Sequence, residues 1–278
     1  MKVFISADIE GCTGIVSFSQ CGGPSGDHYD FAFARRMMTH DVNAAIRGAK
    51  AAGAKLVVVK DGHAHCKNLL IDELEPGTEL ISGAGSGKYG MMDGIDETFD
   101  ASMLIGYHAM AGTPEALMEH ALVGGLHRFW INGVTSGEIA ANAALAGHFG
   151  VPVVMVSSDE AGASEAQSLG CATYATKSAS GKYTGRVKHP SETGPGIEAA
   201  AKEGCNKVKS IKPFQPATPV TMRAEFHKVE EVDMVVTLEG IERLDGYTVE
   251  WTRPDYLAAH AFAYNVFSMS IRGRTAAS

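Results

Sequence analysis

The sequence has few of the features that mark secreted, membrane or nucleic-acid-binding proteins. Its five cysteines are odd in number and never spaced C-x-x-C, which disfavours both a disulfide framework and a thiolate zinc site. No apolar run approaches the roughly 20 residues that a membrane-spanning helix needs. Lys and Arg never cluster, and the formal net charge of -8 disfavours nucleic acid and anionic membranes as partners. Because the start Met1-Lys2-Val3 does not resemble a signal peptide, we expect a cytoplasmic protein.

Strand-type and helix-type segments alternate along the first half of the chain. Short strand-type runs alternate with helical apolar spacing at residues 3–5, 31–52, 55–59, 101–108, 137–148 and 152–156. This alternation predicts an α/β fold in which an open, mostly parallel sheet carries helices on both faces. A smaller α+β C-terminal part should follow. We place a loose boundary near residue 160, so that the two domains would be 1–160 and 161–278.

Turn and cap signals give three further local predictions. Asn132-Gly133 is typical of a hairpin turn between two strands. Ser136 is placed to cap a helix that begins at Gly137 and runs to about His148. The run Gly194-Pro195-Gly196 should interrupt a helix over residues 191–203, because proline lacks an amide donor and clashes inside a helix.

The pair Asp8 and Glu10, at the end of the first predicted strand, is the most informative feature of the chain. Side chains alternate along a strand, so both carboxylates should point to the same side. Two carboxylates held together repel each other unless a cation or a shared proton lies between them. Acidic residues are also common in solvated turns, so the pair alone leaves both interpretations open.

Further oxygen and nitrogen donors follow other predicted strands or begin a helix, at Asp61, His63, His108 and Glu138. In an open α/β sheet, ligands bind in the crevice beyond the carboxyl ends of the strands. This donor set suits Zn²⁺, with Mn²⁺ or Co²⁺ as alternatives, and it exceeds what one tetrahedral site requires. Two metal ions that share one bridging carboxylate would use the whole set and would relieve the repulsion between Asp8 and Glu10.

Each of these donors also has a simpler explanation when it is considered alone. Glu138 would be stabilised by the positive end of its helix. Asp61 could cap the turn that follows it, and His63 and His108 could be ordinary polar residues at strand ends. Their joint placement at successive strand ends favours the metal site.

A set of short motifs lies in order along residues 1–160, comprising Ser6-Ala7-Asp8-Ile9-Glu10-Gly11, Asp61-Gly62-His63, Leu80-Ile81-Ser82-Gly83, Gly106-Tyr107-His108-Ala109-Met110, Met118-Glu119-His120, Ile131-Asn132-Gly133 and Gly137-Glu138. Each motif is short, but the ordered set is specific. Together they resemble the DppA-type D-aminopeptidase family of dinuclear zinc metallopeptidases. The resemblance covers most of residues 1–160 and, more weakly, the rest of the chain.

The resemblance implies a site that holds two zinc ions per subunit, with residues 1–160 as the metal-binding catalytic domain. It places the family's catalytic histidine on His120. It also implies ring-shaped homo-oligomers of ten subunits in two stacked pentamers. The bridging ligand would be the aspartate among the implied metal ligands, which are Asp8, Glu10, His63, His108 and Glu138.

The predicted chemistry is peptide hydrolysis. A metal-bound water has its pKa lowered to roughly 7 and becomes a nucleophile near neutrality. An unligated imidazole such as that of His120 can shuttle protons, although a direct nucleophilic role or a plain polar strand position are alternatives. We expect a metal-dependent aminopeptidase that removes the N-terminal residue, a D-amino acid by the resemblance, from short peptides. The alternatives are another dinuclear amidohydrolase or a phosphoesterase, or a non-catalytic peptide- or metal-binding protein.

Two glycine-rich stretches, residues 21–26 and 83–88, are expected to form loops near the substrate that set its length and side chains. The second stretch is not a phosphate loop. Ser82 and Tyr89 stand where the motif G-x-x-x-x-G-K-[ST] needs a glycine and a Ser or Thr.

Overall fold

The larger of the two main sheets is parallel and has six strands. The computed structural model describes residues 1–22, 30–85 and 89–275. The sheet has the strand order β3-β2-β1-β4-β7-β8, with bounds β1 Lys2–Ala7, β2 Leu56–Asp61, β3 Thr78–Ile81, β4 Ala101–Ile105, β7 Val153–Ser158 and β8 Ala172–Ala175. Ala7, at the end of β1, pairs with Asp61 on one side and Ile105 on the other. The strands therefore end level with one another, and the loops that follow them meet at one edge.

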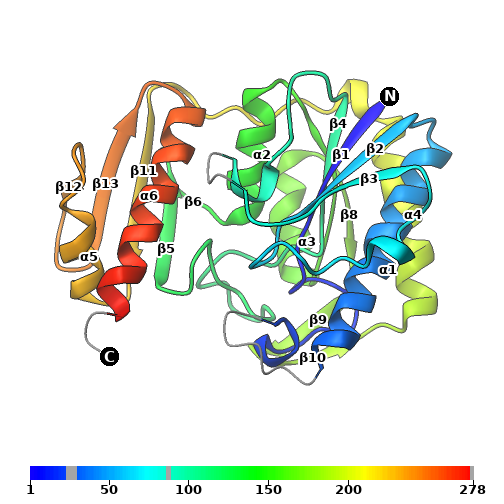
Figure 1. Ribbon diagram of the computed structural model, residues 1–278, viewed down its shortest axis with the longest axis horizontal. Coiled ribbons are helices and arrows are strands. Elements are labelled where there is room, and N and C mark those ends of the chain that lie inside the picture. The colour runs from blue at the N-terminus through cyan, green and yellow to red at the C-terminus, as the bar shows by residue number, and fades with distance from the viewer. Residues whose placement is uncertain (23–29, 86–88, 276–278) are drawn as a thin grey trace.

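Helices cover both faces of this sheet, which confirms the predicted α/β fold (Figure 1). On one face, α1 (Phe31–Ala51) and α4 (Pro190–Asn206) pack together over Val3 and Ile5. On the other face, α2 (Glu138–His148) packs over Phe4 and Leu104, while α3 (Glu160–Ala166) contacts β7 and β8. Neighbouring residues of β1 thus enter opposite cores, as the alternation of a strand requires.

The second main sheet is antiparallel and has five strands. Its order is β12-β13-β11-β5-β6, with bounds β5 Leu126–Ile131, β6 Val134–Thr135, β11 Val220–Phe226, β12 Glu242–Arg243 and β13 Thr248–Arg253. The helix α6 (Tyr256–Thr275) packs against β11, β13 and α5 (Val229–Val235). Phe129, Trp251 and Phe267 of this region join the core cluster that includes α2. Among the described residues, no helix combines the length and apolar character needed to cross a membrane.

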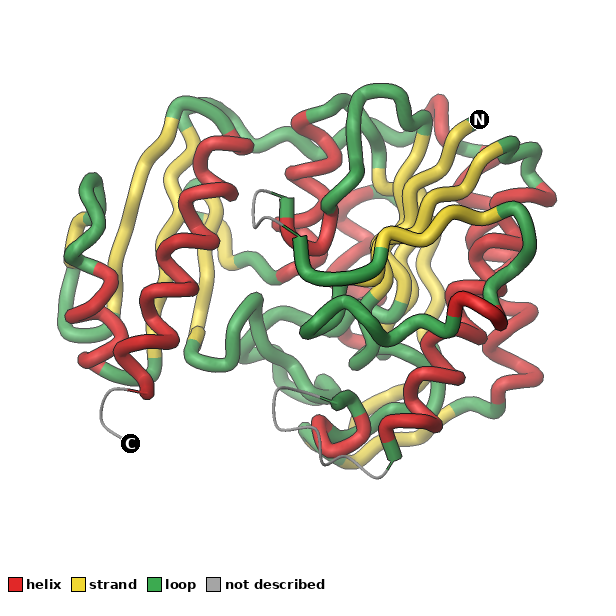
Figure 2. The backbone as a smooth tube through the Cα atoms, viewed as in Figure 1, coloured by secondary structure: helices red, strands yellow, loops and turns green. Residues whose placement is uncertain are grey.

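The two sheets exchange chain on both sides of residue 160. β5 and β6 lie before that position and belong to the antiparallel sheet, whereas β8 and α4 lie after it and belong to the parallel layer. A hairpin of β9 (Lys177–Gly181) and β10 (Thr184–Val187) forms a separate small sheet. A division into 1–160 and 161–278 therefore does not follow the sheets. Loops fill the region between the carboxyl edge of the parallel sheet and the antiparallel sheet (Figure 2).

The predicted hairpin is confirmed, and so are the two predicted helices, but the Ser136 cap of the first helix and the interruption of the second are wrong. Asn132 and Gly133 both have positive φ and join β5 to β6 in a hairpin. Ser136 does not cap α2, because its hydroxyl donates to the Val134 carbonyl instead (2.9 Å), and Gly137 is the cap residue without a side-chain bond.

The helix α4 continues through Pro195 without the predicted interruption. Its buried face, which includes Ile197 and Ala201, packs against α1 in the same core cluster. A Cβ at Gly48 of α1 would lie 2.3 Å from the Glu198 carbonyl oxygen of α4, so the two helices approach at van der Waals distance. Tertiary packing of this kind overrides the local effect of one proline.

Candidate metal centre

The structure brings all five predicted metal ligands and His120 together at the carboxyl edge of the parallel sheet. Asp8 directly follows β1, and its amide donates to the Ile105 carbonyl of β4 (2.8 Å). Gly11 closes the same loop, where any Cβ would lie 1.8 Å from the Tyr107 carbonyl oxygen. Glu10 lies in this loop, and the remaining members come from the loops after β2 and β4 and from the first residue of α2. Four carboxylate or imidazole side chains are almost fully buried there, namely Asp8, Glu10, His108 and Glu138.

Asp8 lies between two imidazoles. Its Oδ1 is 3.1 Å from His63 Nδ1, and its Oδ2 is 3.7 Å from His108 Nε2. Each imidazole also faces a glutamate, with His63 Nδ1 3.1 Å from Glu10 Oε2 and His108 Nε2 3.3 Å from Glu138 Oε1. The donors therefore form two groups that share one aspartate.

Backbone carbonyls fix which nitrogen of each ring faces the carboxylates. His63 Nε2 lies 3.1 Å from the Cys21 carbonyl oxygen, and His108 Nδ1 lies 2.9 Å from that of Ala109. When each ring donates there, its other nitrogen presents a lone pair to the carboxylates, an arrangement typical of metal-binding histidines. The close contacts of Glu10 Oε2 with His63 and of His108 Nε2 with Glu138 are not hydrogen bonds, so both buried atoms lack a hydrogen-bond partner among the described residues. A bound cation would satisfy both atoms, so the donor set fits a metal.

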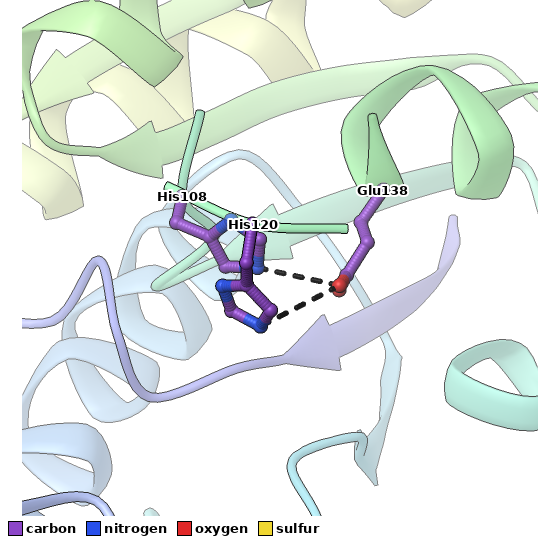
Figure 3. A group of neighbouring side chains, drawn as sticks. All are labelled: His108, His120 and Glu138. Carbon is purple, nitrogen blue, oxygen red and sulfur yellow. Dashed lines mark ion pairs between the residues drawn. The ribbon is translucent and has the colours of Figure 1, made fainter. Parts of the chain in front are cut away.

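Distances between ligand atoms also define two more compact candidate metal groups, which share His108 rather than Asp8 and do not include His63. One consists of Asp8, Glu10 and His108, and the other of His108, His120 and Glu138, with the ligand atoms of each group within 4.8 Å of one another. Figure 3 shows the second group, in which both imidazoles turn toward the Glu138 carboxylate from loops while Glu138 projects from the start of α2. All of these donors are oxygen or nitrogen, which suits zinc.

The electrostatics of the cluster favour a bound cation. Burial and then the negative charge of Glu10 raise the pKa of Asp8 to about 7. Burial opposes protonation of His108, but the carboxylates of Glu138 and Asp8 outweigh it and raise the pKa of this imidazole to about 10. The carboxylates thus need positive charge, which protons supply when no metal is bound and which a divalent cation supplies better.

His120 lies at the rim of this cluster with its side chain 24% exposed. Its ring stacks on His108 with centroids 3.8 Å apart, and its Nδ1 lies 2.9 Å from the Met118 carbonyl oxygen. Its Nε2 is 3.9 Å from Glu138 Oε1. Burial and the neighbouring His108 charge lower the pKa of His120. The structure places His120 in a loop, in an isolated bridge with Met110, and not within a strand. With its lowered pKa, the imidazole can accept a proton at Nε2.

Asp61, the remaining carboxylate at a strand end, supports a loop instead. Its Oδ2 accepts from the amides of Asn68 and Leu69 (2.6 and 2.8 Å), and its Oδ1 accepts from Asn68 Nδ2 (2.8 Å). These bonds hold the loop that carries His63, so Asp61 has a structural role, although its partners are Asn68 and Leu69 rather than the turn directly after it.

Lys177 is a buried residue that the sequence analysis missed. Its Nζ donates to the carbonyl oxygens of Glu10, Cys12 and Ile15 at 2.5, 2.7 and 2.5 Å, and burial lowers its pKa. It therefore ties β9 to the loop that carries two candidate ligands. A single lysine in a polar strand carries no sequence signal for this role.

The candidate ligands open into a cavity of about 440 Å³, whose other walls are formed mainly by small and apolar residues such as Gly62, Ala64, Met91, Leu122 and Val123. A second cavity of about 530 Å³ shares Glu10, His120 and Gly124 with the first. Of the two loops expected to shape the substrate site, residues 23–26 and 86–88 lie outside the described residues.

Comparison with known proteins covers nearly the whole chain. A peptidase M55 family model, described as D-aminopeptidase, matches residues 1–264. The chain belongs to this D-aminopeptidase family. A D-aminopeptidase of Bacillus subtilis (strain 168) is 30% identical over 265 residues, which is 94% of each chain. The solved structure of "Zn-dependent D-aminopeptidase DppA from Bacillus subtilis, a self-compartmentalizing protease" has a TM-score of 0.93 at 29% identity and covers 98% of both chains.

Membership of the D-aminopeptidase family confirms the resemblance seen in the sequence and extends it beyond residue 160. The matched region includes the antiparallel sheet as well as the parallel one, so both sheets belong to the family fold. The chain is accordingly an enzyme of a metallopeptidase family and not a binding protein.

Proposed function

We propose that this protein uses two zinc ions to remove the N-terminal D-amino acid from short peptides. The observation that carries the proposal is the shared aspartate, since the two oxygens of Asp8 face two different imidazoles. The orphaned atoms Glu10 Oε2 and His108 Nε2 support a cation in each half of the cluster. The zinc dependence of the similar D-aminopeptidase supports the choice of metal.

In this proposal Asp8 would be shared by the two ions, and the other residues that would hold them are Glu10 and His63 in one half of the cluster and His108 and Glu138 in the other. Bound zinc would activate a water molecule and polarise the scissile carbonyl. The lowered pKa of His120 leaves its Nε2 unprotonated at neutral pH, so this atom can accept a proton and return it to the leaving amine. The bond from His120 Nδ1 to the Met118 carbonyl keeps the ring in that tautomer.

The cavity lining favours peptide over phosphate substrates. Phosphoesterases commonly hold the phosphate with cationic side chains. Among the described residues, no Lys or Arg lines the cavity at the candidate ligands. Lys177, which lies nearby, donates to three backbone carbonyls instead.

We further propose that the protein is a cytoplasmic homo-oligomer, a decamer of two stacked pentamers. The description of the similar Bacillus subtilis enzyme as self-compartmentalizing supports an assembly that encloses its active sites. Light scattering of the purified protein should give ten times the chain mass. A monomer or dimer at micromolar concentration would overturn this part of the proposal.

Metal depletion and reconstitution test the catalytic proposal. After chelation and readdition of Zn²⁺, elemental analysis should find two zinc ions per chain, and matched D- and L-N-terminal dipeptides and tripeptides should be assayed together. We expect turnover of the D series only, absent in the chelated protein and restored by zinc. A protein loaded with two zinc ions that hydrolyses neither series would overturn the proposal.

A further inference from the structure

The second cavity extends outward from the candidate metal centre toward the antiparallel sheet. It shares Glu10 and His120 with the inner cavity, and its outer wall includes His127 and His227. His127 lies on β5, and His227 directly follows β11. The cavity therefore meets the metal centre at one end and carries two imidazoles at its other wall.

A β-bulge places His127 in this wall. Leu126 pairs with Phe226 and Arg128 pairs with Glu225, so two steps along β5 match one step along β11 and His127 is the extra residue. Bulges of this kind are frequent beside active sites, where they change the direction of a side chain. The His127 ring meets the His227 ring edge to face, with centroids 5.1 Å apart.

The other charged groups of this cavity are already paired. Lys182 Nζ lies 2.8 Å from Glu119 Oε1 and 2.9 Å from the Glu119 carbonyl oxygen, and Glu119 Oε2 accepts from the Gly112 amide (2.6 Å). Within the described part of the chain, neither His127 nor His227 uses a ring nitrogen in a hydrogen bond. The two imidazoles are therefore the donors that remain for a ligand.

We propose that His127 and His227 bind the C-terminal carboxylate of a short peptide substrate. An aminopeptidase holds the N-terminal residue of its substrate at the metal centre, so the C-terminal carboxylate of a short peptide would lie farther along the cavity, where the imidazole pair is. Phe18 and Tyr183, whose rings meet with centroids 6.0 Å apart, line the same cavity and would contact the peptide between its ends. This inference rests on the aminopeptidase function proposed above and adds a selectivity for free C-termini.

Two substrates that differ only in C-terminal charge test the inference. The zinc-loaded enzyme should be assayed with D-alanyl-glycine and D-alanyl-glycinamide, which share the same scissile bond. Because hydrogen bonds to a charged group are stronger than neutral ones, we expect KM for the amide to be about tenfold higher than for the acid. The variants are His127→Gln, His227→Gln and the double variant, with His148→Gln, an exposed histidine outside both cavities, as the control.

In the double variant the ratio of the two KM values should fall toward one, mainly through a higher KM for the acid, while His148→Gln keeps the wild-type ratio. Because His227 is exposed, the single variant His227→Gln should fold even if the bulge does not tolerate glutamine at position 127. Equal KM values for acid and amide in the wild type, or an unchanged ratio in the folded variants, would overturn the inference alone. No turnover of either substrate by the zinc-loaded wild type would overturn the aminopeptidase proposal and this inference with it.

Discussion

The two main sheets contribute to the active-site region in different ways. The parallel sheet delivers Asp8, Glu10, His63 and His108 from three strands that end level with one another, and these side chains are buried or nearly so. The antiparallel sheet contributes His127 and His227 to the outer wall of the second cavity. Parallel strands share a direction, so their ends cluster without special sequence features. Neighbouring antiparallel strands run in opposite directions, so their ends do not cluster in this way. Here a bulge in β5 directs the His127 side chain into the second cavity.

This difference suggests a division of labour between the two regions. The buried carboxylates and imidazoles of the inner cluster would take part in the chemical step of the proposed reaction, so their loss should lower kcat. The half-exposed residues of the outer cavity act on binding, so their loss should raise KM. Variants in each region test whether the chemical step and substrate binding are separated in this way.

Asp8→Asn should have the largest effect. Asparagine keeps the shape of the side chain but removes the charge that the two halves of the cluster share, so zinc binding should weaken in both. Because bound metal supplies several kcal/mol of transition-state stabilisation, turnover should fall on the order of 10³-fold. Elemental analysis and steady-state assays measure the two effects. Asp72→Asn, an exposed aspartate, is the control, and an Asp8 variant that retains both zinc ions would contradict the bridging role.

The stacked pair His108 and His120 separates metal binding from proton transfer within the inner region. His108→Ala should lose zinc together with activity. His120→Ala should keep its zinc and lose about 10²- to 10⁴-fold in kcat, because it removes the proton shuttle but no proposed ligand. The exposed His65→Ala serves as the control for both. If His120→Ala lost zinc instead, His120 would be a ligand, which its position in the second candidate metal group would accommodate.

Lys177→Met tests how far the inner region depends on its support. The variant leaves three buried carbonyl oxygens of the loop after β1 without their charged donor, and we expect it to lower the free energy of unfolding by about 2–4 kcal/mol. Urea denaturation measures this loss. Lys207→Met, which breaks only an exposed ion pair with Glu203, should change it by less than about 1 kcal/mol. A Lys177 variant as stable as the wild type would show that the loop holds its shape without the lysine.

The inner region could be predicted from the sequence because its physical cause is local. The apolar run Val3-Phe4-Ile5 predicts both a strand and the position where that strand ends. The parallel arrangement then brings several such strand ends together at one edge of the sheet. The position of Glu138 follows from the predicted helix start, although Ser136 does not cap that helix, because its hydroxyl bonds within the preceding turn. Local signals and tertiary structure agree at these positions.

The outer region could not be predicted because its cause is non-local. The bulge at His127 depends on a one-residue shift against β11, about 100 residues later in the chain, and no pattern in β5 encodes it. Lys177 likewise reaches Glu10 across more than 160 positions. Pro195 shows the same limit, since the packing of α4 on α1 outweighs a signal that is reliable in isolated helices.

Tyr183→Ala should have the smallest effect on activity of these variants, and it tests whether the outer cavity acts on substrate binding alone. The ring is 53% exposed in the turn between β9 and β10, and it meets Phe18, which in turn meets His120 at 5.3 Å between centroids. Loss of an exposed aromatic wall should raise KM for dipeptides by about threefold, and kcat should stay within twofold, because His120 keeps its bond to the Met118 carbonyl. Tyr247→Ala, of similar exposure (49%) but outside both cavities, is the control. A fall in kcat as large as that of His120→Ala would mean that Tyr183 positions His120 through Phe18. Residues of the outer cavity would then affect the chemical step as well as binding.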